Sequence, residues 1–224
     1  ATGTISVTDV DSNQAVFSTV VTGVGSPLGS LVLAANGSYT YTVSNALTQS
    51  LGAGQTALDT FTVTSADGTT KNVSFTINGS NDAPTVISGT TGVIVEGATA
   101  GSTVYSTTAT DPDNSTTFTY SLSGADAGAF TVNASTGVVT INAIPNYESK
   151  SSYTFNVIAS DGSLTATKAV TVSVTNVAPA ISSGALGSVT EGATAGTTVY
   201  TAAATDIAGG TVSYSLSGTD AGSF

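Results

Sequence analysis

The sequence predicts an all-β protein made of tandem antiparallel β-sandwiches in a linear array, with the last sandwich truncated. Hydrophobic and polar residues alternate with a period of two in many short segments, which is typical of half-buried strands. No stretch combines a helical period with capping residues. A long segment also occurs twice, 94 or 95 positions apart, so the same structural unit is repeated along the chain.

The repetition defines three predicted repeats. The segment "ISGTTGVIVEGATAGSTVY" begins at Ile87, and "ISSGALGSVTEGATAGTTVY" begins at Ile181. A more distant copy precedes them, since "SVTDVDSN" near the start is similar to "TATDPDNS". Proline in the linkers "NDAP" and "NVAP" favours extended junctions. We therefore predict repeats over 1–84, 85–179 and 180–224, and we expect the chain to be a piece of a longer one.

The strands of the first repeat follow its alternating segments. These are "SYTYTV" (38–43), "TFTVTS" (60–65) and "NVSFTI" (72–77), which are rich in β-branched and aromatic residues. Asn36-Gly37 lies just before the first of them and predicts a hairpin turn.

The second repeat carries the strands "YTFNVIAS" (153–160) and "AVTVSV" (169–174) and enough apolar residues for a core. The residues predicted to form that core are Val104, Tyr120, Leu122, Phe130, Val132, Ile141, Phe155, Val157, Val170 and Val172. The third repeat stops at Phe224 with about half of the strands, so we expect it to be marginal by itself.

The composition limits the possible functions. The chain of 224 residues has 14 acidic residues, three lysines, no arginine and a net charge of −11, which argues against binding to nucleic acid and to acidic membrane surfaces. Cysteine and histidine are absent, so oxygen is the remaining metal ligand, and oxygen suits calcium or magnesium. No apolar run is long enough to span a membrane, so we expect no direct membrane insertion in this segment.

The acidic residues fall mainly at strand ends. Asp111 and Asp113 follow one predicted strand, Asp161 follows another, and Asn81 with Asp82 enters from the linker at the same pole. One interpretation is turn chemistry, because aspartate bonds to its own backbone in turns. The other is a calcium site, because a hard cation relieves the repulsion between converging carboxylates. Asp126 and Asp220 recur in register, and we interpret them as turn residues.

The second repeat resembles a cadherin repeat of the kind found in large bacterial surface proteins. Glu96 in "VEG" stands where cadherins have the glutamate of their PEN motif, Asp111 and Asp113 match the DxD motif, and Asp161 matches A-x-D. "AGAFTVNASTGVVTI" is similar to the segment F-x-I-D-x-x-T-G-x-I, and Asn146-Tyr147-Glu148 to L-D-x-E. The resemblance covers 85–179 and, truncated, 180–224, and it implies immunoglobulin-like, cadherin-like sandwiches.

The first repeat resembles a VCBS repeat. The residues that carry this resemblance are "SVTDVDSN", "NGSYTYTVSNALTQSLGAGQTALDTFTVTSADGTT" and the closing "INGSNDAP". A VCBS repeat followed by cadherin-like repeats is an arrangement of large repetitive bacterial surface adhesins.

The cadherin resemblance implies how calcium ligands are distributed. The first junction would use Asn81, Asp82, Asp111, Asp113 and Asp161. The second junction would use Glu96, Glu148, Asn176 and Asp206. A third group, Asp9, Asp11 and Asp67, would face a repeat before the first one.

The second junction departs from the family pattern, because Val177 replaces the linker aspartate, Ile207-Ala208 replaces the rest of the DxD motif and Asn146 is neutral. We therefore expect weaker calcium binding there, and we interpret Glu191 as an ordinary surface residue.

These observations favour a calcium-binding structural or adhesion module outside the cell, not an enzyme. Calcium at the junctions would stiffen neighbouring repeats of a bacterial cell-surface or secreted adhesin, as in biofilms. Expected partners are the neighbouring repeats, with other cell-surface molecules or a second copy as adhesion partners.

The sequence leaves two alternatives. One is a carbohydrate- or other ligand-binding sandwich without structural calcium, which an exposed cluster of Tyr105 with Tyr200 would favour. The other is a glycosidase using Asp111 and Asp161, but no apolar surroundings or partner would separate their pKa values.

Overall fold

The computed structural model describes residues 1–11, 14–113 and 117–224. Parts of the two similar stretches "SVTDVDSN" and "TATDPDNS", namely residues 12–13 and 114–115, lie outside the described residues, as does residue 116. The predicted all-β class is confirmed, since nearly all regular structure consists of strands in small sheets.

The chain forms two compact units. Unit 1 comprises 1–85, 110–117 and 161–165, and unit 2 comprises 86–109, 118–160 and 166–224. Residues 180–224 group with unit 2, and the division into three repeats stays a prediction.

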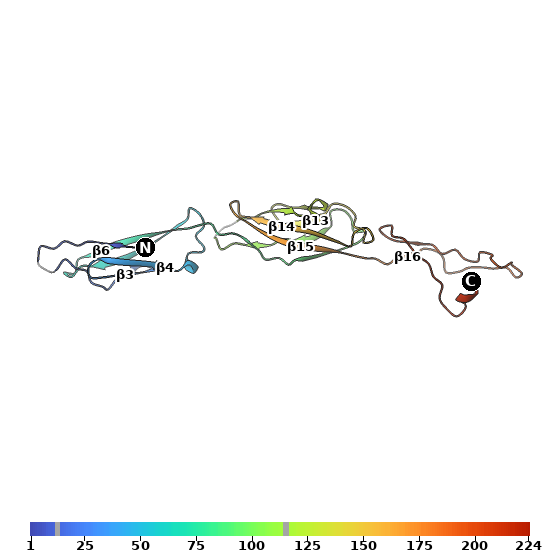
Figure 1. Cartoon of the computed structure of the whole chain (residues 1–224), viewed down its shortest axis with the longest axis horizontal. Coiled ribbons are helices and arrows are strands. Elements are labelled where there is room, and N and C mark those ends of the chain that lie inside the picture. The colour runs from blue at the N-terminus through green and yellow to red at the C-terminus, as the bar shows by residue number, and fades with distance from the viewer. Residues whose placement is uncertain (12–13, 114–116) are drawn as a thin grey trace. The chain divides into compact units, whose positions relative to one another are not determined.

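Unit 1 contains two three-stranded sheets, β1-β4-β3 and β2-β5-β6 (Figure 1). The strand bounds are β1 (Thr2–Thr4), β2 (Thr22–Val24), β3 (Gly29–Leu33), β4 (Ser38–Val43), β5 (Thr56–Thr64) and β6 (Thr70–Asn78), with a short 3-10 helix η1 (Asn45–Leu47). All three predicted strand segments are strands. Their inward side chains form a core of Leu31, Leu33, Tyr41, Phe61, Val63 and Ile77.

The predicted hairpin at Asn36-Gly37 joins β3 to β4. The Gly37 N–H donates to the Ala34 carbonyl at 2.9 Å, and the Ala34 N–H donates to the Ser38 carbonyl at 2.8 Å. Gly37 has a φ of +84°, which a side chain disfavours. The turn chemistry therefore fixes the register of Leu31 opposite Tyr41 in the core.

Unit 2 contains a second sandwich with sheets β11-β14-β15-β8 and β12-β13-β9. The strand bounds are β8 (Thr91–Val95), β9 (Thr103–Ser106), β11 (Thr119–Ser123), β12 (Phe130–Val132), β13 (Val138–Ile141), β14 (Ser152–Ser160) and β15 (Thr165–Thr175); β7 (Thr85–Val86) pairs with β10 (Ala109–Thr110), and η2 (Ala127–Ala129) precedes β12. One pairing differs from the antiparallel expectation, because β15 runs parallel to β8. The first and last strands of the sandwich meet there, and the whole intervening chain provides the long connection that a parallel pair needs.

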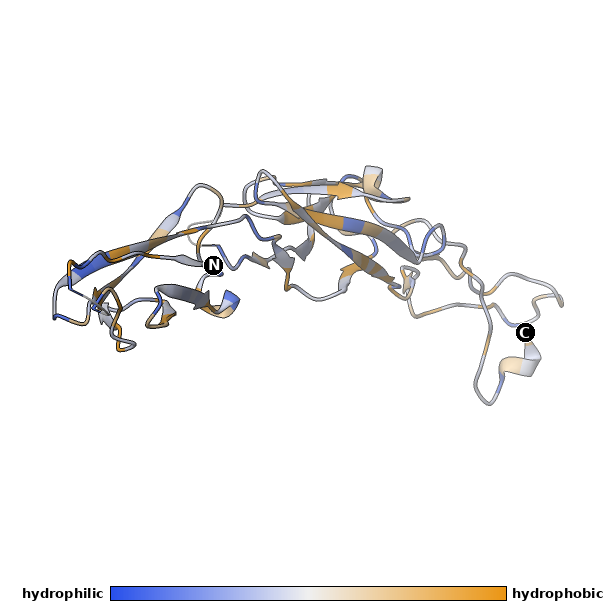
Figure 2. Cartoon of the chain, turned by 60° about the vertical axis from the view of Figure 1, so that its left-hand side comes forward, coloured by the Kyte–Doolittle hydropathy of each residue, from blue (hydrophilic) through white to orange (hydrophobic). Residues whose placement is uncertain are grey.

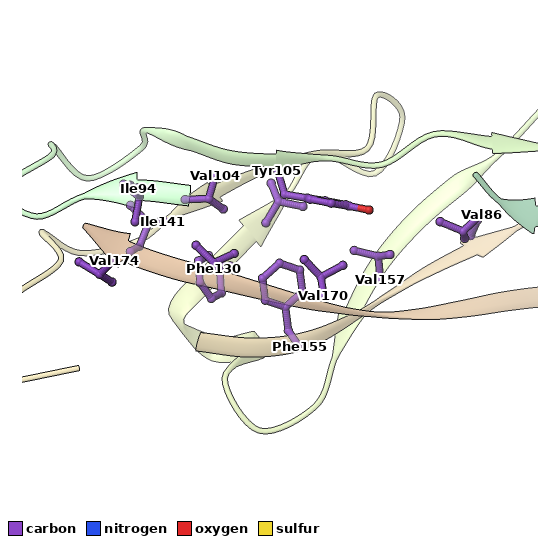
Figure 3. Close-up of a cluster of buried hydrophobic side chains, with 13 residues drawn as sticks. Val86, Ile94, Val104, Tyr105, Phe130, Ile141, Phe155, Val157, Val170 and Val174 are labelled. Carbon is purple, nitrogen blue, oxygen red and sulfur yellow. The ribbon is translucent and has the colours of Figure 1, made fainter. Parts of the chain in front are cut away.

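The core of the second sandwich is largely as predicted. Seven of the predicted residues are buried, whereas Tyr120, Leu122 and Val132 pack against the cluster half-buried. The rings of Phe130 and Phe155 lie 4.7 Å apart at its centre (Figure 3). Buried residues that the prediction omitted are Val86, Ile94, Tyr105, Val139, Ala159 and Val174. Hydrophobic and hydrophilic residues alternate along the long strands, so one side chain in two enters this core (Figure 2).

The segment 180–224 has little regular structure and no buried residue. It contains β16 (Ala180–Ile181), which pairs with β17 (Ala204–Thr205), and a 3-10 helix η3 (Ala221–Ser223). Every residue in it is exposed or half-buried. Among the described residues, no helix has the length and apolar character needed to cross a membrane.

Candidate metal centre

Three carboxylates of unit 2 converge on one point. One oxygen each from Glu96, Glu148 and Asp206 lies within 4.8 Å of the other two. Glu96 follows β8, Glu148 lies in the loop between β13 and β14, and Asp206 follows β17. We call this set the second cluster, because it contains the acids predicted for the second junction.

Glu96 is the fixed member of the second cluster. Its side chain is only 1% exposed. The Tyr147 N–H donates to its Oε2 at 3.1 Å, and the Val177 N–H donates to its Oε1. Backbone donors from two loops therefore hold a buried carboxylate in place, which offsets part of its desolvation.

The other two members are positioned by loop contacts. Asn176 Nδ2 donates to Glu148 Oε1 at 3.2 Å. Asp206 Oδ1 accepts hydrogen bonds from the N–H groups of Ala208 at 3.1 Å and Gly210 at 3.2 Å. All four residues predicted for the second junction therefore lie together.

Asn146, which departs from the family pattern, is a structural part of this site. Its Nδ2 donates to the Ala208 carbonyl at 2.8 Å, and its Oδ1 accepts from the Ser149 N–H at 2.7 Å. The neutral amide therefore ties the loop after Asp206 to the loop that carries Glu148. The sequence analysis counts Asn146 as a missing acidic ligand. Its place in the motif was nevertheless the signal that it belongs to the site.

Small residues let the loops of the second cluster approach. A Cβ on Gly97 would lie 2.9 Å from Ile207, and one on Gly210 would lie 3.2 Å from the Glu148 carboxyl carbon. Ile207, a second departure from the family motif, therefore packs against the turn that follows Glu96.

The second cluster fits a hard divalent cation. It offers carboxylate oxygens, which calcium prefers, and like charges this close repel one another without an ion. Among the described residues the one salt bridge joins Lys150 to Asp126, so no lysine neutralises the cluster. The donor set is thus compatible with calcium and unsuited to softer metals.

The residues predicted for the first junction also lie together, all within unit 1, and we call them the first cluster. The Asp82 N–H donates to Asp113 Oδ2 at 3.0 Å. Asn81 Nδ2 donates to Asp161 Oδ2 at 2.9 Å. The linker residues are thereby tied to the two loops named in the sequence prediction. Gln49, which the sequence prediction missed, donates its Nε2 to Asp82 Oδ2 at 3.1 Å.

Turn chemistry and ligand chemistry coexist in the first cluster. The Asp113 N–H donates to Asp111 Oδ1 at 2.8 Å, and Asp161 Oδ1 accepts from the N–H groups of Ser163 and Leu164. The hydrogen bond from Leu164, followed by those from Asn81 and Ser163, lowers the pKa of Asp161. Asp111 Oδ2, in contrast, is buried and has no hydrogen-bond partner among the described residues. An orphaned carboxylate oxygen of this kind fits a cation ligand.

The structure favours a different cluster as the cation site from the one that the sequence favours. The family pattern favours the first cluster, because the second contains substitutions. Within the described part of the chain, however, only Glu96, Glu148 and Asp206 place three acidic side chains within 4.8 Å of one another. Whether either cluster binds calcium stays a prediction.

Among the described residues, the third predicted group does not form a set of three acidic side chains within 4.8 Å of one another. The Asp11 N–H donates to Asp9 Oδ1 at 2.8 Å, which is a local turn. Asp67 accepts from the Ser65 hydroxyl and from the Thr69 N–H at 3.2 Å, and the Ser65 bond is the main cause of its lowered pKa. Among the described residues no hydrogen bond joins Asp67 to the other two.

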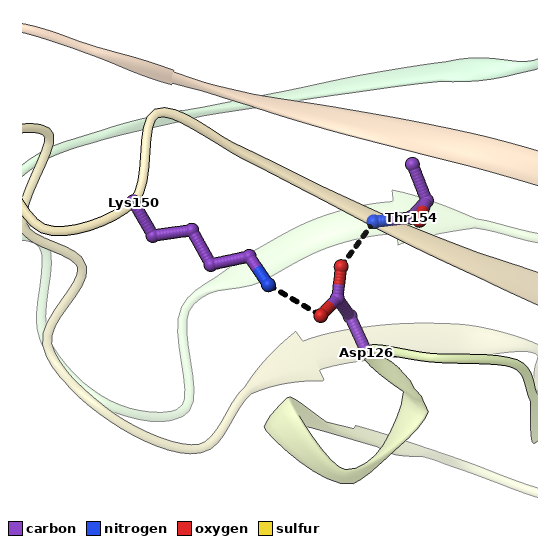
Figure 4. Close-up of polar contacts among 3 residues, drawn as sticks. All are labelled: Asp126, Lys150 and Thr154. Atoms are coloured by element: carbon purple, nitrogen blue, oxygen red, sulfur yellow. Dashed lines mark hydrogen bonds and ion pairs between the residues drawn. The ribbon is translucent and has the colours of Figure 1, made fainter.

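Asp126 lies in the turn before η2, but its carboxylate makes no hydrogen bond within that turn and contacts residues far along the chain instead. Its carboxylate accepts from Lys150 Nζ and, at 2.7 Å, from the Thr154 N–H (Figure 4). The hydrogen bond from Lys150 is the main cause of its lowered pKa. The carboxylate is therefore satisfied by the protein itself.

Comparisons with known proteins agree with this architecture. Residues 90–175 match the family model of the cadherin domain. The structure of human CDH23 EC21-23 is 26% identical with a TM-score of 0.52, over 79% of this chain and 61% of that one. The protocadherin gammaB7 EC3-6 cis-dimer structure is 19% identical with a TM-score of 0.51, over 84% of this chain and 50% of that one.

The chain spans half or less of the length of the first three similar structures, with coverages of 50%, 45% and 34%. No curated protein matches it. The fold is thus shared with cadherin structures, and the family match applies to the second sandwich.

Proposed function

We propose that this chain is a calcium-binding extracellular adhesion module whose repeats are stiffened by calcium. The single observation that carries the proposal is the convergence of Glu96, Glu148 and Asp206 within 4.8 Å, with no lysine to neutralise them. The match of residues 90–175 to the cadherin domain, a family of calcium-dependent adhesion modules without catalytic activity, supports the adhesion class over an enzyme.

The mechanism follows from the contacts of each cluster. In the second cluster, Glu96 is fixed by backbone donors, whereas Asp206 belongs to the loosely packed segment 180–224. Calcium supplies the positive charge that lets these carboxylates stay together. Binding would therefore fasten the loop after β17 to the sandwich, and loss of the ion would release it by repulsion.

The first cluster would act in the same way on the linker. Asn81 and Asp82 already contact Asp161 and Asp113, and the orphaned Oδ2 of Asp111 offers a further ligand. Extracellular calcium modules bind with a Kd of about 10⁻⁴–10⁻³ M, so both clusters would respond to calcium outside the cell.

The finer identity rests on sequence resemblance. The VCBS-like first repeat before cadherin-like repeats supports a bacterial surface or secreted adhesin, as in biofilms. Its partners would be neighbouring repeats together with another cell-surface molecule or a second copy.

The carbohydrate-binding alternative loses its main support. Tyr105 is only 7% exposed and donates its hydroxyl to Ser88 and Gly89, whereas Tyr200 is 40% exposed. The two tyrosines therefore do not form the exposed pair that would have favoured a sugar platform.

Calcium titration by calorimetry, with thermal melts alongside, tests the proposal on the whole chain. We expect saturable binding near 10⁻⁴–10⁻³ M and a rise in the melting temperature. The variant Glu148→Gln/Asp206→Asn should lose the second site, and Asp111→Asn/Asp113→Asn should lose the first. The double variant Glu191→Gln/Asp220→Asn removes the same charge from exposed positions and should bind as the parent does. Absence of heat and of any melting shift at 10 mM calcium would refute the calcium proposal.

A further inference from the structure

One loop of unit 1 reaches the first cluster without bringing a carboxylate to it. This loop, residues 45–52, follows β4 and begins with η1. Gln49 Nε2 donates to Asp82 Oδ2 at 3.1 Å, and a Cβ on Gly52 would lie 3.2 Å from the Asp113 carboxyl carbon. The sequence of the loop, "NALTQSLG", contains no acidic residue. The loop therefore meets two of the predicted ligands with a neutral amide and with backbone.

Packing and backbone contacts hold this loop in place. The Leu51 N–H donates to the Thr48 carbonyl at 3.0 Å, and the Leu51 side chain packs against the core of unit 1. A Cβ on Gly79 would lie 2.3 Å from the carbonyl oxygens of Leu51 and Gly52, so the loop lies directly against the residue that follows β6. Gln49 is thus presented by a packed loop.

The carboxylates of the first cluster repel one another, and side-chain amides offset part of that repulsion. The carboxylates are those of Asp82, Asp111, Asp113 and Asp161. Among the described residues, the one salt bridge lies elsewhere. The amides of Gln49 and Asn81 each donate to one of these carboxylates. An N–H group directed at a carboxylate carries partial positive charge, so each amide acts in the direction in which a cation would act.

The amide of Gln49 and a cation would compete for the same oxygen. Asp82 is half-buried, and its Oδ2 accepts the hydrogen bond from Gln49. The Asp82 N–H donates to Asp113 Oδ2 at 3.0 Å, so both the side chain and the backbone of Asp82 hold the linker to the cluster. A divalent cation attracts a carboxylate more strongly than a neutral amide does. Gln49 therefore makes the contact that an ion would take over.

We propose that Gln49 is a positioning residue that takes the place of the cation in the ion-free first cluster and holds Asp82 until calcium displaces its amide. The ion-free part of this proposal rests on the hydrogen bond between Gln49 and Asp82. The displacement by calcium rests on the function proposed above. The linker would thus be held first by a neutral donor and then by the ion.

Hydrogen exchange at the Asp82 amide of the whole chain, in the presence of a chelator, tests the ion-free part. We expect Gln49→Ala to speed this exchange roughly ten-fold or more, because Asp82 loses the side-chain donor that fixes it. Gln55→Ala is the matched control, because Gln55 lies exposed just before β5 and should leave the exchange unchanged. Unchanged exchange in Gln49→Ala would show that the proposal is wrong.

Added calcium separates a substitute for the ion from an ordinary structural contact. At about 10 mM calcium, well above the expected Kd, the Asp82 amide of Gln49→Ala should be as protected as in the parent, because the ion then holds the carboxylate.

A charged variant tests the same competition by calorimetry, in the background Glu148→Gln/Asp206→Asn so that only the first cluster titrates. Gln49→Glu should bind calcium roughly ten-fold more tightly than the parent, because it adds a carboxylate ligand. In chelator it should melt at a lower temperature, because the new carboxylate faces Asp82. Gln55→Glu adds the same charge at an exposed position and should bind calcium as the parent does.

The outcomes distinguish this proposal from the calcium proposal. If the parent binds calcium but the ion leaves the Asp82 amide of Gln49→Ala unprotected, Gln49 is an ordinary structural contact and the proposal is wrong. Equal calcium affinities of Gln49→Glu and Gln55→Glu would also contradict it. A parent that binds no calcium would refute the proposed function, and the exchange comparison in chelator would then decide the role of Gln49 by itself.

Discussion

Glu96 and Glu191 occupy the same motif, "EGATAG", but have different surroundings. Glu96 is 1% exposed and accepts two backbone hydrogen bonds, whereas Glu191 is exposed. The motif alone determines only the local turn. A carboxylate becomes a candidate ligand when loops from elsewhere in the chain converge on it. The chain thus contains its own control for the role of Glu96.

We expect Glu96→Gln to weaken calcium binding at the second cluster by roughly ten-fold or more, because it removes one charge from a set of three. Glu191→Gln changes the same side chain at an exposed position and should leave the affinity unchanged. Calorimetric titration of both variants measures the difference, and equal affinities would exclude Glu96 as a ligand.

Asp59 is a buried carboxylate that the sequence analysis did not single out. It is 2% exposed and accepts hydrogen bonds from the Leu28 N–H at 2.9 Å, the Gly29 N–H at 2.6 Å and the Tyr41 hydroxyl at 2.7 Å. The sequence feature that could have identified it is an acidic residue at an inward position of the alternating segment "TALDTFTVT". Burial and the bond to Asp59 raise the pKa of Tyr41 to about 12, so its hydroxyl remains a donor.

Burial opposes ionisation of Asp59, but the hydrogen bonds from Tyr41, Leu28 and Gly29 together lower its pKa below the ordinary value of 3.8. A lowered folded-state pKa stabilises the fold above the unfolded-state value, and that contribution is lost as the pH falls through the folded-state pKa. We therefore expect the amides of Leu28 and Gly29 to lose hydrogen-exchange protection below about pH 4.

Asp59→Asn should remove this pH dependence and cost about 1–3 kcal/mol at neutral pH, since the amide cannot accept all three bonds. Hydrogen exchange at Leu28 and Gly29 in the variant tests this. A pH profile like that of the parent would assign the effect to another group.

At the scale of the element, the β3–β4 hairpin depends on one glycine for two reasons. Gly37 has a φ of +84°, and a Cβ there would lie 2.0 Å from the Ile5 carbonyl oxygen. Gly54 has a similar φ of +79° but open space around it. A comparison of substitutions at the two glycines therefore separates the cost of backbone strain from the cost of steric contact.

We expect Gly54→Ala to destabilise unit 1 by about 1–2 kcal/mol, the cost of a left-handed conformation for a residue with a side chain. Gly37→Ala should cost clearly more, because the backbone near Ile5 must also move. Urea unfolding of both variants compares the two costs, and equal values would mean that the contact with Ile5 relaxes freely.

At the scale of the whole molecule, the net charge of −11 makes both clusters sensitive to ions. Without calcium, we expect the melting temperature to rise between 10 mM and 1 M NaCl, because salt screens the repulsion between carboxylates. With saturating calcium the same salt range should have a smaller effect, since the bound ion already relieves the repulsion. A salt response that is identical with calcium and with a chelator would contradict this account.

The sequence by itself determined the fold class, the strand positions and most of the second core. Alternation with a period of two reports which side chains face inward wherever a strand is covered on one side, as in β14 and β15. The Asn-Gly turn was an equally local property, whereas the contacts of the Asp126 carboxylate with Lys150 and Thr154 were not. The parallel pairing of β15 with β8 was not, because it joins the two ends of the sandwich.

Only the tertiary structure decided how the acidic residues are grouped. Ligand motifs placed Glu96, Glu148 and Asp206 in a weaker junction, yet the loops around Asn146 and Gly210 bring their carboxylates within 4.8 Å of one another. Burial was also decided at this level, since Glu96 and Glu191 lie in the same motif, "EGATAG", but only Glu96 is buried. The physical reason is that convergence and burial depend on strands supplied from elsewhere in the chain, which the pattern of a single segment does not encode.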